Sequence, residues 1–178
     1  MKTNFETYAQ LYKTHIDELY SYGLSLGHTE AICMDAIHDV FCKLIAKDAD
    51  IETIDNPKFY LFRSMKNRLL DMLKHDNKML YSDRNFPTDL SVEDDSLVTS
   101  QERELLTARV KHLMDQLTPT QREAIYLRYM QEMEYDQIAI LLQITPESVR
   151  KLIHRGVKRL RQQNLGLLGY MLIMYLLK

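Results

Sequence analysis

Three short pairs, each a helix-capping residue followed by proline, constrain the fold of this chain more than any other feature: Asn56-Pro57, Thr118-Pro119 and Thr145-Pro146. An Asn or Thr side chain accepts a hydrogen bond from the first turn of a helix, and proline suits the next position because its missing N–H is not needed there. Apolar residues recur at helical spacing after each pair. Because the 178 residues include only five glycines and four prolines, the sequence predicts an all-α fold.

The same periodicity predicts two small helical domains joined by an acidic linker. Gly23, Gly27 and His28 predict a break after the first helical segment, and Thr29 can cap the next helix. Periodicity disappears from Tyr81 to Ser100, where polar and acidic residues dominate. Helices are expected over residues 4–26 (one or two), 29–47, 56–78, 106–117, 118–129, 135–142 and 145–164. The expected organisation is a first domain over 1–78, a linker over 79–101, a second domain over 102–164 and an apolar tail over 165–178.

Charge is distributed unevenly along the chain, whose net charge is only −2. Residues 76–104 carry 3 basic and 8 acidic side chains, a net −5. Residues 105–178 carry 11 basic and 6 acidic side chains, a net +5. This asymmetry indicates a polyanion contact in the C-terminal part alone.

Cysteine usage and hydropathy indicate a cytoplasmic protein. Cys33 and Cys42 lie nine residues apart, which places them on opposite faces of one helix, and they are expected to be reduced, buried thiols. No secretory signal is visible at the N-terminus. The apolar run 165–177 is shorter than the roughly 20 residues of a membrane-spanning helix. It is expected to pack on a domain or contact a partner, in preference to a membrane surface.

The segment from Met133 to Arg161 predicts a helix-turn-helix. Apolar residues of a short helix are followed by a turn at Gln143-Ile144, where a left-handed backbone is expected, and then by a capped helix. The inner side of that second helix is predicted to carry Val149, Leu152 and Ile153. Its outer side would offer hydrogen-bonding groups to base edges and phosphates: Ser148, Arg150, Lys151, His154 and Arg155, followed by Lys158, Arg159 and Arg161. The alternative is a solvated basic helix that packs on a bundle.

Several motifs resemble the extracytoplasmic-function (ECF) sigma factors, a family of bacterial initiation factors for RNA polymerase. Residues 34–44 (MDAIHDVFCKL) are similar to the polymerase-docking helix of the family's region two, and residues 57–71 (PKFYLFRSMKNRLLD) to its next helix. Residues 117–123 (LTPTQRE) and 126–129 (YLRY) are similar to the opening of region four. The resemblance covers about residues 5–78 and 102–163 in the family's order. His38 and Asp39 stand where the family usually has Gln and Glu.

The resemblance implies a role for each matching segment. Core RNA polymerase would be bound by Asp35, His38, Asp39, Phe41 and Leu44. The loop 48–55, with Asp50 and Ile51, would hold a base flipped from the minus-ten element. Arg63, Lys66, Asn67 and Lys74 would lie along the non-template strand, and the second helix of the helix-turn-helix would read the minus-thirty-five element. Further partners would be promoter DNA and a membrane-linked anti-sigma factor. The acidic linker would either thread through the polymerase, as the resemblance implies, or serve as an inert spacer.

Two other classes of function are alternatives to a sigma factor. A stand-alone helix-turn-helix repressor or activator would use its N-terminal half to sense a ligand or to dimerise, and would bind duplex DNA by itself. An enzyme is disfavoured because the sequence has no Gly-rich phosphate loop, no HExxH and no framed carboxylate pair. No catalytic residue, metal site, cofactor or small-molecule substrate is therefore expected.

Overall fold

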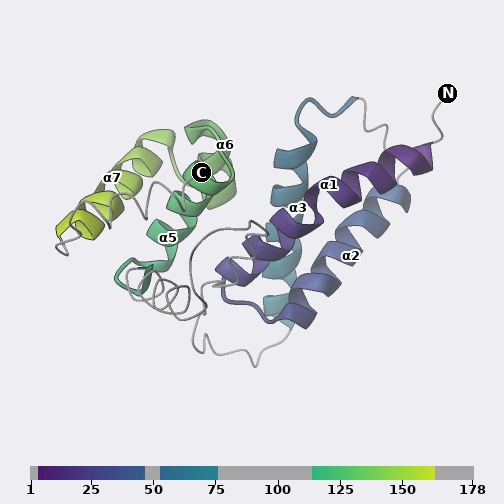
Figure 1. Cartoon of the computed structure of the whole chain (residues 1–178), viewed down its shortest axis with the longest axis horizontal. Helices are drawn as coiled ribbons and strands as arrows, with labels where there is room; N and C mark the ends of the chain where they lie inside the picture. Colours follow the sequence, from purple (N-terminus) through teal and green to yellow (C-terminus); the bar gives the residue numbers. More distant parts are fainter. Residues whose placement is uncertain (1–3, 47–52, 76–113, 163–178) are drawn as a thin grey trace, which may run out of the picture. The chain divides into compact units, whose positions relative to one another are not determined.

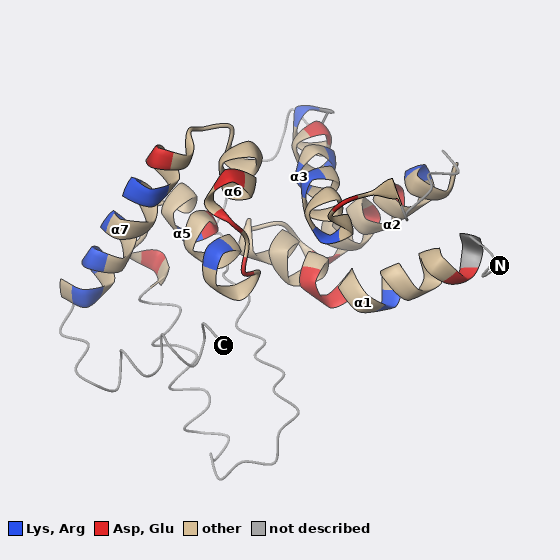
Figure 2. Ribbon diagram, turned by 90° about the horizontal axis from the view of Figure 1, so that it is seen from above, with Lys and Arg blue, Asp and Glu red and all other residues tan. Residues whose placement is uncertain are grey.

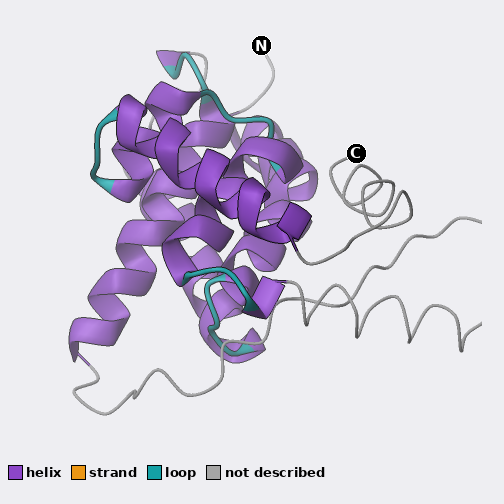
Figure 3. Ribbon diagram, turned by 90° about the vertical axis from the view of Figure 1, so that its left-hand side faces the viewer, coloured by secondary structure: helices purple, strands orange, loops and turns teal. Residues whose placement is uncertain are grey.

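The computed structural model describes residues 4–46, 53–75 and 114–162, and the chain separates into two compact units, residues 1–85 and 86–178 (Figure 1). Within the described residues every regular element is a helix (Figure 3), which confirms the predicted all-α fold. No helix among these residues is long and apolar enough to cross a membrane. The predicted linker, the helix predicted from residue 106, and the tail lie largely or wholly outside the described residues.

The first unit is built from three helices that pack against one another: α1 (Asn4–Ser25), α2 (Glu30–Ala46) and α3 (Pro57–His75) (Figure 1). Every pair of these helices is in contact, so one apolar core is shared by all three. The largest fully buried side chains of this core are Leu19, Tyr22, Ile37, Leu44, Leu61, Phe62, Met65 and Leu69.

The predicted caps begin two of these helices. The Thr29 hydroxyl accepts a hydrogen bond from the Ile32 N–H at 3.4 Å, and the Asn56 side-chain oxygen accepts one from the Phe59 N–H at 2.9 Å. Both bonds satisfy N–H groups of a first turn, which have no partner within the helix. The starts of α2 and α3 therefore follow from short-range side-chain chemistry.

Gly23 does not mark a break in the first unit, contrary to the prediction. It lies inside α1, and a Cβ at this position would stand 2.6 Å from Cys33 Sγ of α2. The chain turns at Gly27, which has the positive φ of 87° that glycine tolerates best. Gly23 therefore permits a close approach of α1 and α2.

The two cysteines differ in exposure, so the prediction of two buried thiols holds for only one of them. Cys33 is buried, whereas Cys42 is exposed on α2. Burial, with a smaller contribution from Glu30, raises the pKa of the Cys33 thiol to about 11. Cys33 is therefore protonated at neutral pH and behaves as a small apolar core residue.

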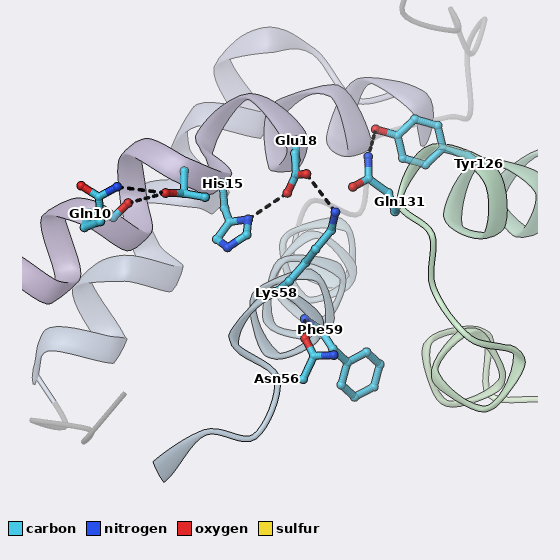
Figure 4. A network of polar contacts seen from close by, with 9 residues as sticks. Gln10, His15, Glu18, Asn56, Lys58, Phe59, Tyr126 and Gln131 are labelled. Carbon is cyan, nitrogen blue, oxygen red and sulfur yellow. Dashed lines mark hydrogen bonds and ion pairs between the residues drawn. The ribbon is translucent and has the colours of Figure 1, made fainter. Parts of the chain in front are cut away.

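A polar network ties α1 to α3 (Figure 4). The Glu18 carboxylate accepts a hydrogen bond from Lys58 Nζ at 2.8 Å and lies 2.8 Å from His15 Nδ1. Burial alone would raise the pKa of Glu18, but the hydrogen bonds and charges of Lys58 and His15 outweigh it and lower that pKa below its ordinary 4.5. The ionised carboxylate is thus favoured by the folded unit.

The second unit comprises α5 (Pro119–Ile125), the π-helical turn η2 (Tyr126–Met130), α6 (Tyr135–Leu142) and α7 (Pro146–Gln162). Thr118 and Gln121 form the predicted capping box at the start of α5. The single helix expected to reach Tyr129 instead widens at Tyr126 into η2. Tyr126 Oη accepts a hydrogen bond from Gln131 Nε2 at 3.0 Å across this wider turn (Figure 4).

Helices α6 and α7 are joined by the predicted tight turn. Gln143 adopts the left-handed conformation, with φ 55° and ψ 42°, and the next N–H, of Ile144, donates to the Ala139 carbonyl at 3.0 Å. Thr145 then caps α7 by accepting a hydrogen bond from the Ser148 N–H at 3.2 Å. A non-glycine residue in this conformation costs about 1 kcal/mol, which the turn tolerates.

Helix α7 is anchored along one side on α5 and α6. Val149, Ile153, Gly156 and Leu160 are its buried residues. A Cβ at Gly156 would lie 2.7 Å from Ile125 Cδ1 of α5, so only glycine fits this crossing without rearrangement. The side chains on the opposite side of α7 are exposed, from Arg150 to Arg161, in the part of the second unit that the structure describes.

Candidate nucleic-acid interface

The outer side of α7 presents basic side chains at every turn. Lys and Arg recur along the whole helix (Figure 2), and the predicted DNA-contacting residues other than Ser148 are all exposed: Arg150, Lys151, His154, Arg155, Lys158, Arg159 and Arg161. Glu147 is the single acidic residue of the helix. A braced helix with this charge suits the major groove, since its neighbours hold the buried side.

The predicted DNA-contacting residues are held in different ways at the start of α7. The Arg150 guanidinium lies over the Tyr135 ring of α6, with 5.2 Å between its Cζ and the ring centre. Lys151 Nζ lies 2.6 Å from the Glu147 carboxylate. Ser148 is half-buried, and its hydroxyl lies 2.9 Å from the Thr145 hydroxyl. Among residues 114–162, nothing engages the N–H donors of Arg150, whereas the Lys151 ammonium is paired with Glu147 and the Ser148 hydroxyl shares a hydrogen bond with Thr145 in which either hydroxyl can donate.

Helix α3 carries a second polar face, which includes four of the residues predicted to meet the non-template strand. Arg63, Asn67 and Lys74 are exposed, and Lys66 is half-buried. Their spacing places Arg63, Asn67 and Lys74 along one side of the helix. The stripe also contains Leu70, which the sequence reasoning missed and which is 36% exposed. The other two residues predicted to bind the minus-ten element, Asp50 and Ile51, lie outside the described residues.

The structure corrects two of the five predicted polymerase-binding residues on α2. Phe41 is 5% exposed and Leu44 is 1% exposed, so both support the core from the inner side of the helix and cannot offer a contact surface. The apolar groups on the outer side are instead Met34 and Ile45, exposed by 42% and 47%. They share this side with Asp35 and His38, which are also exposed. Helical periodicity alone could have identified Met34 and Ile45, because residues 34, 38 and 45 fall on one face of the helix.

Asp39, the fifth predicted polymerase-binding residue, is engaged within the unit. Its carboxylate forms an ion pair with Arg68 of α3. Arg68 was not singled out from the sequence, because nothing local relates positions 39 and 68. The outer face of α2 consists of five exposed residues: Met34, Asp35, His38, Cys42 and Ile45. No group of His, Cys, Asp and Glu suited to a metal ion occurs among the described residues.

A basic helix-turn-helix and a separate three-helix unit define the class as a two-unit DNA-binding protein. The family description Sigma-70 region 2 matches residues 11–79, and Sigma-70, region 4 matches residues 107–160. Together the two matches span more than half of the chain and follow the family's order. The chain belongs to the ECF sigma factors, and its function is to direct the initiation of transcription.

Known relatives agree with this assignment. The ECF RNA polymerase sigma factor SigX of Bacillus subtilis (strain 168) is 23% identical over 171 residues, covering 88% of this chain and 83% of its own. The sigma factor RpoE, solved with the anti-sigma factor NepR from Bartonella quintana, is similar with a TM-score of 0.63 at 18% identity, over 88% of this chain and 96% of its own. CnrH, solved with the cytosolic domain of CnrY, is similar with a TM-score of 0.57 at 22% identity, over 88% of this chain and 86% of its own. Both solved structures share the fold.

Proposed function

We propose that this sigma factor docks on core RNA polymerase through the outer face of α2 and reads promoter DNA with α3 and α7. The observation that carries the proposal is the division of α7 into a buried apolar side and an exposed side with six Lys and Arg residues. A solvated helix of a bundle does not need such a concentration of positive charge, whereas a helix in the major groove does. Helix α7 would read the minus-thirty-five element.

The docking surface on α2 combines an apolar and an acidic character. Met34 and Ile45 supply exposed apolar area near the two ends of the helix, while Asp35 and His38 supply polar groups between them. Exposed apolar side chains surrounded by polar groups are typical of protein-binding sites. The resemblance of residues 34–44 to the family's docking helix supports the same location. Phe41 and Leu44 contribute by fixing the position of the helix on the core.

The remaining assignments extend the proposal along the chain. Arg63, Lys66, Asn67 and Lys74 would follow the non-template strand, with Asp50 and Ile51 in the loop that holds a flipped base. We propose the first domain over residues 1–78, an acidic linker over 79–101 that threads through the polymerase, the second domain over 102–164, and the tail over 165–178. The protein would act in the cytoplasm, as a regulator without catalytic activity.

We also propose that an anti-sigma factor holds this chain inactive. Two solved proteins with this fold are described in complexes, RpoE with the anti-sigma factor NepR and CnrH with the cytosolic domain of CnrY. If the partner is a membrane protein that binds this chain through a cytosolic domain, it would link this chain to a signal received at the membrane. The exposed apolar residues Met34 and Ile45 offer such a partner a surface that core polymerase would otherwise occupy.

Size-exclusion chromatography of the full chain with bacterial core RNA polymerase tests the proposal. The wild type should co-elute with the polymerase and be displaced by another sigma factor. Asp35→Arg reverses a charge on the docking face and should weaken the complex by about tenfold or more. Asp17→Arg, an equal change at an exposed position of α1, is the matched control and should bind as the wild type does.

The choice of Asp35 avoids a confounding loss of structure. Asp39 pairs with Arg68, so an arginine at position 39 would oppose a second arginine and disturb the fold. If the chain fails to bind polymerase but binds duplex DNA tightly as a dimer, it is a stand-alone helix-turn-helix regulator. If Asp35→Arg and the wild type bind polymerase equally, docking uses another surface.

A further inference from the structure

We infer that Tyr135 is a positioning residue for promoter recognition: its ring holds the Arg150 guanidinium ready to read a guanine in the upstream element. The inference rests on the proposed function, since it requires that α7 reads DNA. Tyr135 is the first residue of α6, and Arg150 lies in the second turn of α7. The contact therefore joins the two helices of the helix-turn-helix at the end where α7 begins.

The geometry is that of a cation held against an aromatic ring. Arg150 Cζ lies 5.2 Å from the ring centre of Tyr135, within the roughly 6 Å over which such contacts are attractive. Tyr135 is half-buried, whereas Arg150 is exposed. Within residues 114–162, no ion pair or hydrogen bond engages the Arg150 side chain. Among these residues, the ring is thus the group that restrains this guanidinium.

A ring restrains a guanidinium without using its hydrogen-bond donors, because the attraction acts through the ring face. All five N–H groups of Arg150 stay available, and two of them suffice for the paired contact to O6 and N7 of guanine. Lys151 differs, since its ammonium lies 2.6 Å from the Glu147 carboxylate and must leave that ion pair to contact DNA. Arg150 is therefore the residue of this pair that determines base preference.

The ring is itself fixed by a second arginine. Arg128 Cζ lies 4.8 Å from the Tyr135 ring centre, and Arg128 Nη1 donates to the Met133 carbonyl at 2.8 Å and to a Glu134 carboxylate oxygen at 3.3 Å. These bonds hold Arg128 against the segment that leads into α6. The orientation of the ring is consequently set before DNA arrives, which reduces the ordering cost of binding.

Selection from a DNA library provides the experiment. Holoenzyme made from the full chain and bacterial core RNA polymerase is mixed with duplexes randomised across both promoter elements, and the bound duplexes are sequenced. Wild type should prefer guanine at one upstream position, and Arg150→Ala should reduce that preference by about tenfold or more. Tyr135→Leu should reduce it by about threefold, whereas Tyr135→Phe should stay within about twofold of wild type.

Two further variants separate positioning from general effects. Lys158→Ala should lower the occupancy of all duplexes without changing the guanine preference, as expected for a phosphate contact. Fluorinated phenylalanines at position 135 nearly preserve the shape of the ring while weakening its attraction for a cation. Increasing fluorination should therefore lower the guanine preference progressively, even if Tyr135→Leu proves unstable.

The possible failures are distinguishable. If the fully fluorinated ring leaves the Arg150-dependent preference unchanged, Tyr135 does not position Arg150, and the proposed function of α7 still stands. If the wild-type holoenzyme shows no upstream preference, the assignment of α7 as the reading helix fails and the inference fails with it. If a preference exists but Arg150→Ala leaves it unchanged, the inference alone fails, because other residues of α7 then read the element.

Discussion

At the scale of single residues, Glu18 is the clearest case of a side chain whose chemistry is set by the fold. Its carboxylate oxygens lie 2.8 Å from Lys58 Nζ of α3 and 2.8 Å from His15 Nδ1 of the same helix. Despite partial burial, these partners lower the pKa of Glu18 below 4.5. The folded unit therefore binds a proton at this site less readily than the unfolded chain does, and stability becomes linked to pH.

We expect acid to weaken the first unit partly through Glu18. Because the folded-state pKa is the lower one, the stabilising contribution is complete above pH 4.5 and is lost as the pH falls through the folded value. Amide exchange in α1 and α3, followed from about pH 6 to about pH 3, should lose protection more steeply in wild type than in Glu18→Gln. Asp17→Asn, at an exposed position of the same helix, should behave like wild type.

An equal loss of protection in wild type and Glu18→Gln would contradict this account. It would mean that other carboxylates govern the acid response of the unit, and that the contacts of Glu18 with Lys58 and His15 contribute no net stability. Because ion pairs with partial exposure contribute about 0–1 kcal/mol, the difference in stability between wild type and Glu18→Gln should lie within this range.

At the scale of elements, α5 and α7 cross closely at Gly156. A Cβ there would stand 2.7 Å from Ile125 Cδ1. We expect Gly156→Ala to change the free energy of unfolding of the second unit by less than about 1 kcal/mol, because the contact is with a terminal methyl group that can shift, and the gain of about 1 kcal/mol in helix propensity offsets the remaining strain. Urea unfolding, with amide exchange reporting on α5 and α7, measures the difference.

A second substitution makes this prediction specific. Ile125→Val deletes the Cδ1 atom and by itself should cost about 0.5–1.5 kcal/mol. In the Gly156→Ala background the same deletion relieves the clash, so the double variant should be more stable than the sum of the two single changes predicts. Additive losses would show that the crossing adjusts by another route.

Sequence reasoning succeeded for elements whose chemistry is local. Thr29, Asn56 and Thr118 cap helices within three residues of themselves, and the left-handed turn at Gln143 follows from the spacing of its two helices. It failed where a partner is distant in the sequence. The role of Gly23 depends on Cys33, and the ion pair of Asp39 depends on Arg68.

The candidate site shows the same division. The exposed basic side of α7 could be predicted from helical periodicity, because one face of the helix is uniformly apolar and the other is charged. On α2, the family motif drew Phe41 and Leu44 into the predicted docking set although both are buried. A motif records which residues recur, and it does not separate those that contact a partner from those that support the helix. The contact of Tyr135 with Arg150 required coordinates.

At the scale of the whole molecule, the surface proposed to bind polymerase and the helix proposed to read the upstream element belong to different units. Replacing Arg150 and Arg155 with alanine should therefore abolish promoter-specific initiation while leaving the affinity for core polymerase within about twofold of wild type. In vitro transcription and co-elution measure the two properties separately. Retained promoter-specific initiation by the double variant would refute the assignment of α7, whereas loss of co-elution would show that the units do not act independently.

The ion pair between Asp39 and Arg68 has a consequence for genetic screens. It links the helix proposed to dock on polymerase with the helix proposed to follow the DNA strand, through two side chains that need touch neither ligand. Loss-of-function alleles at these positions would mimic defects in docking and in promoter opening together. The double variant Asp39→Arg with Arg68→Asp restores opposite charges at the two positions and should therefore recover function that each single variant loses. A residue that contacts polymerase or DNA directly would not be rescued by such an exchange within the chain.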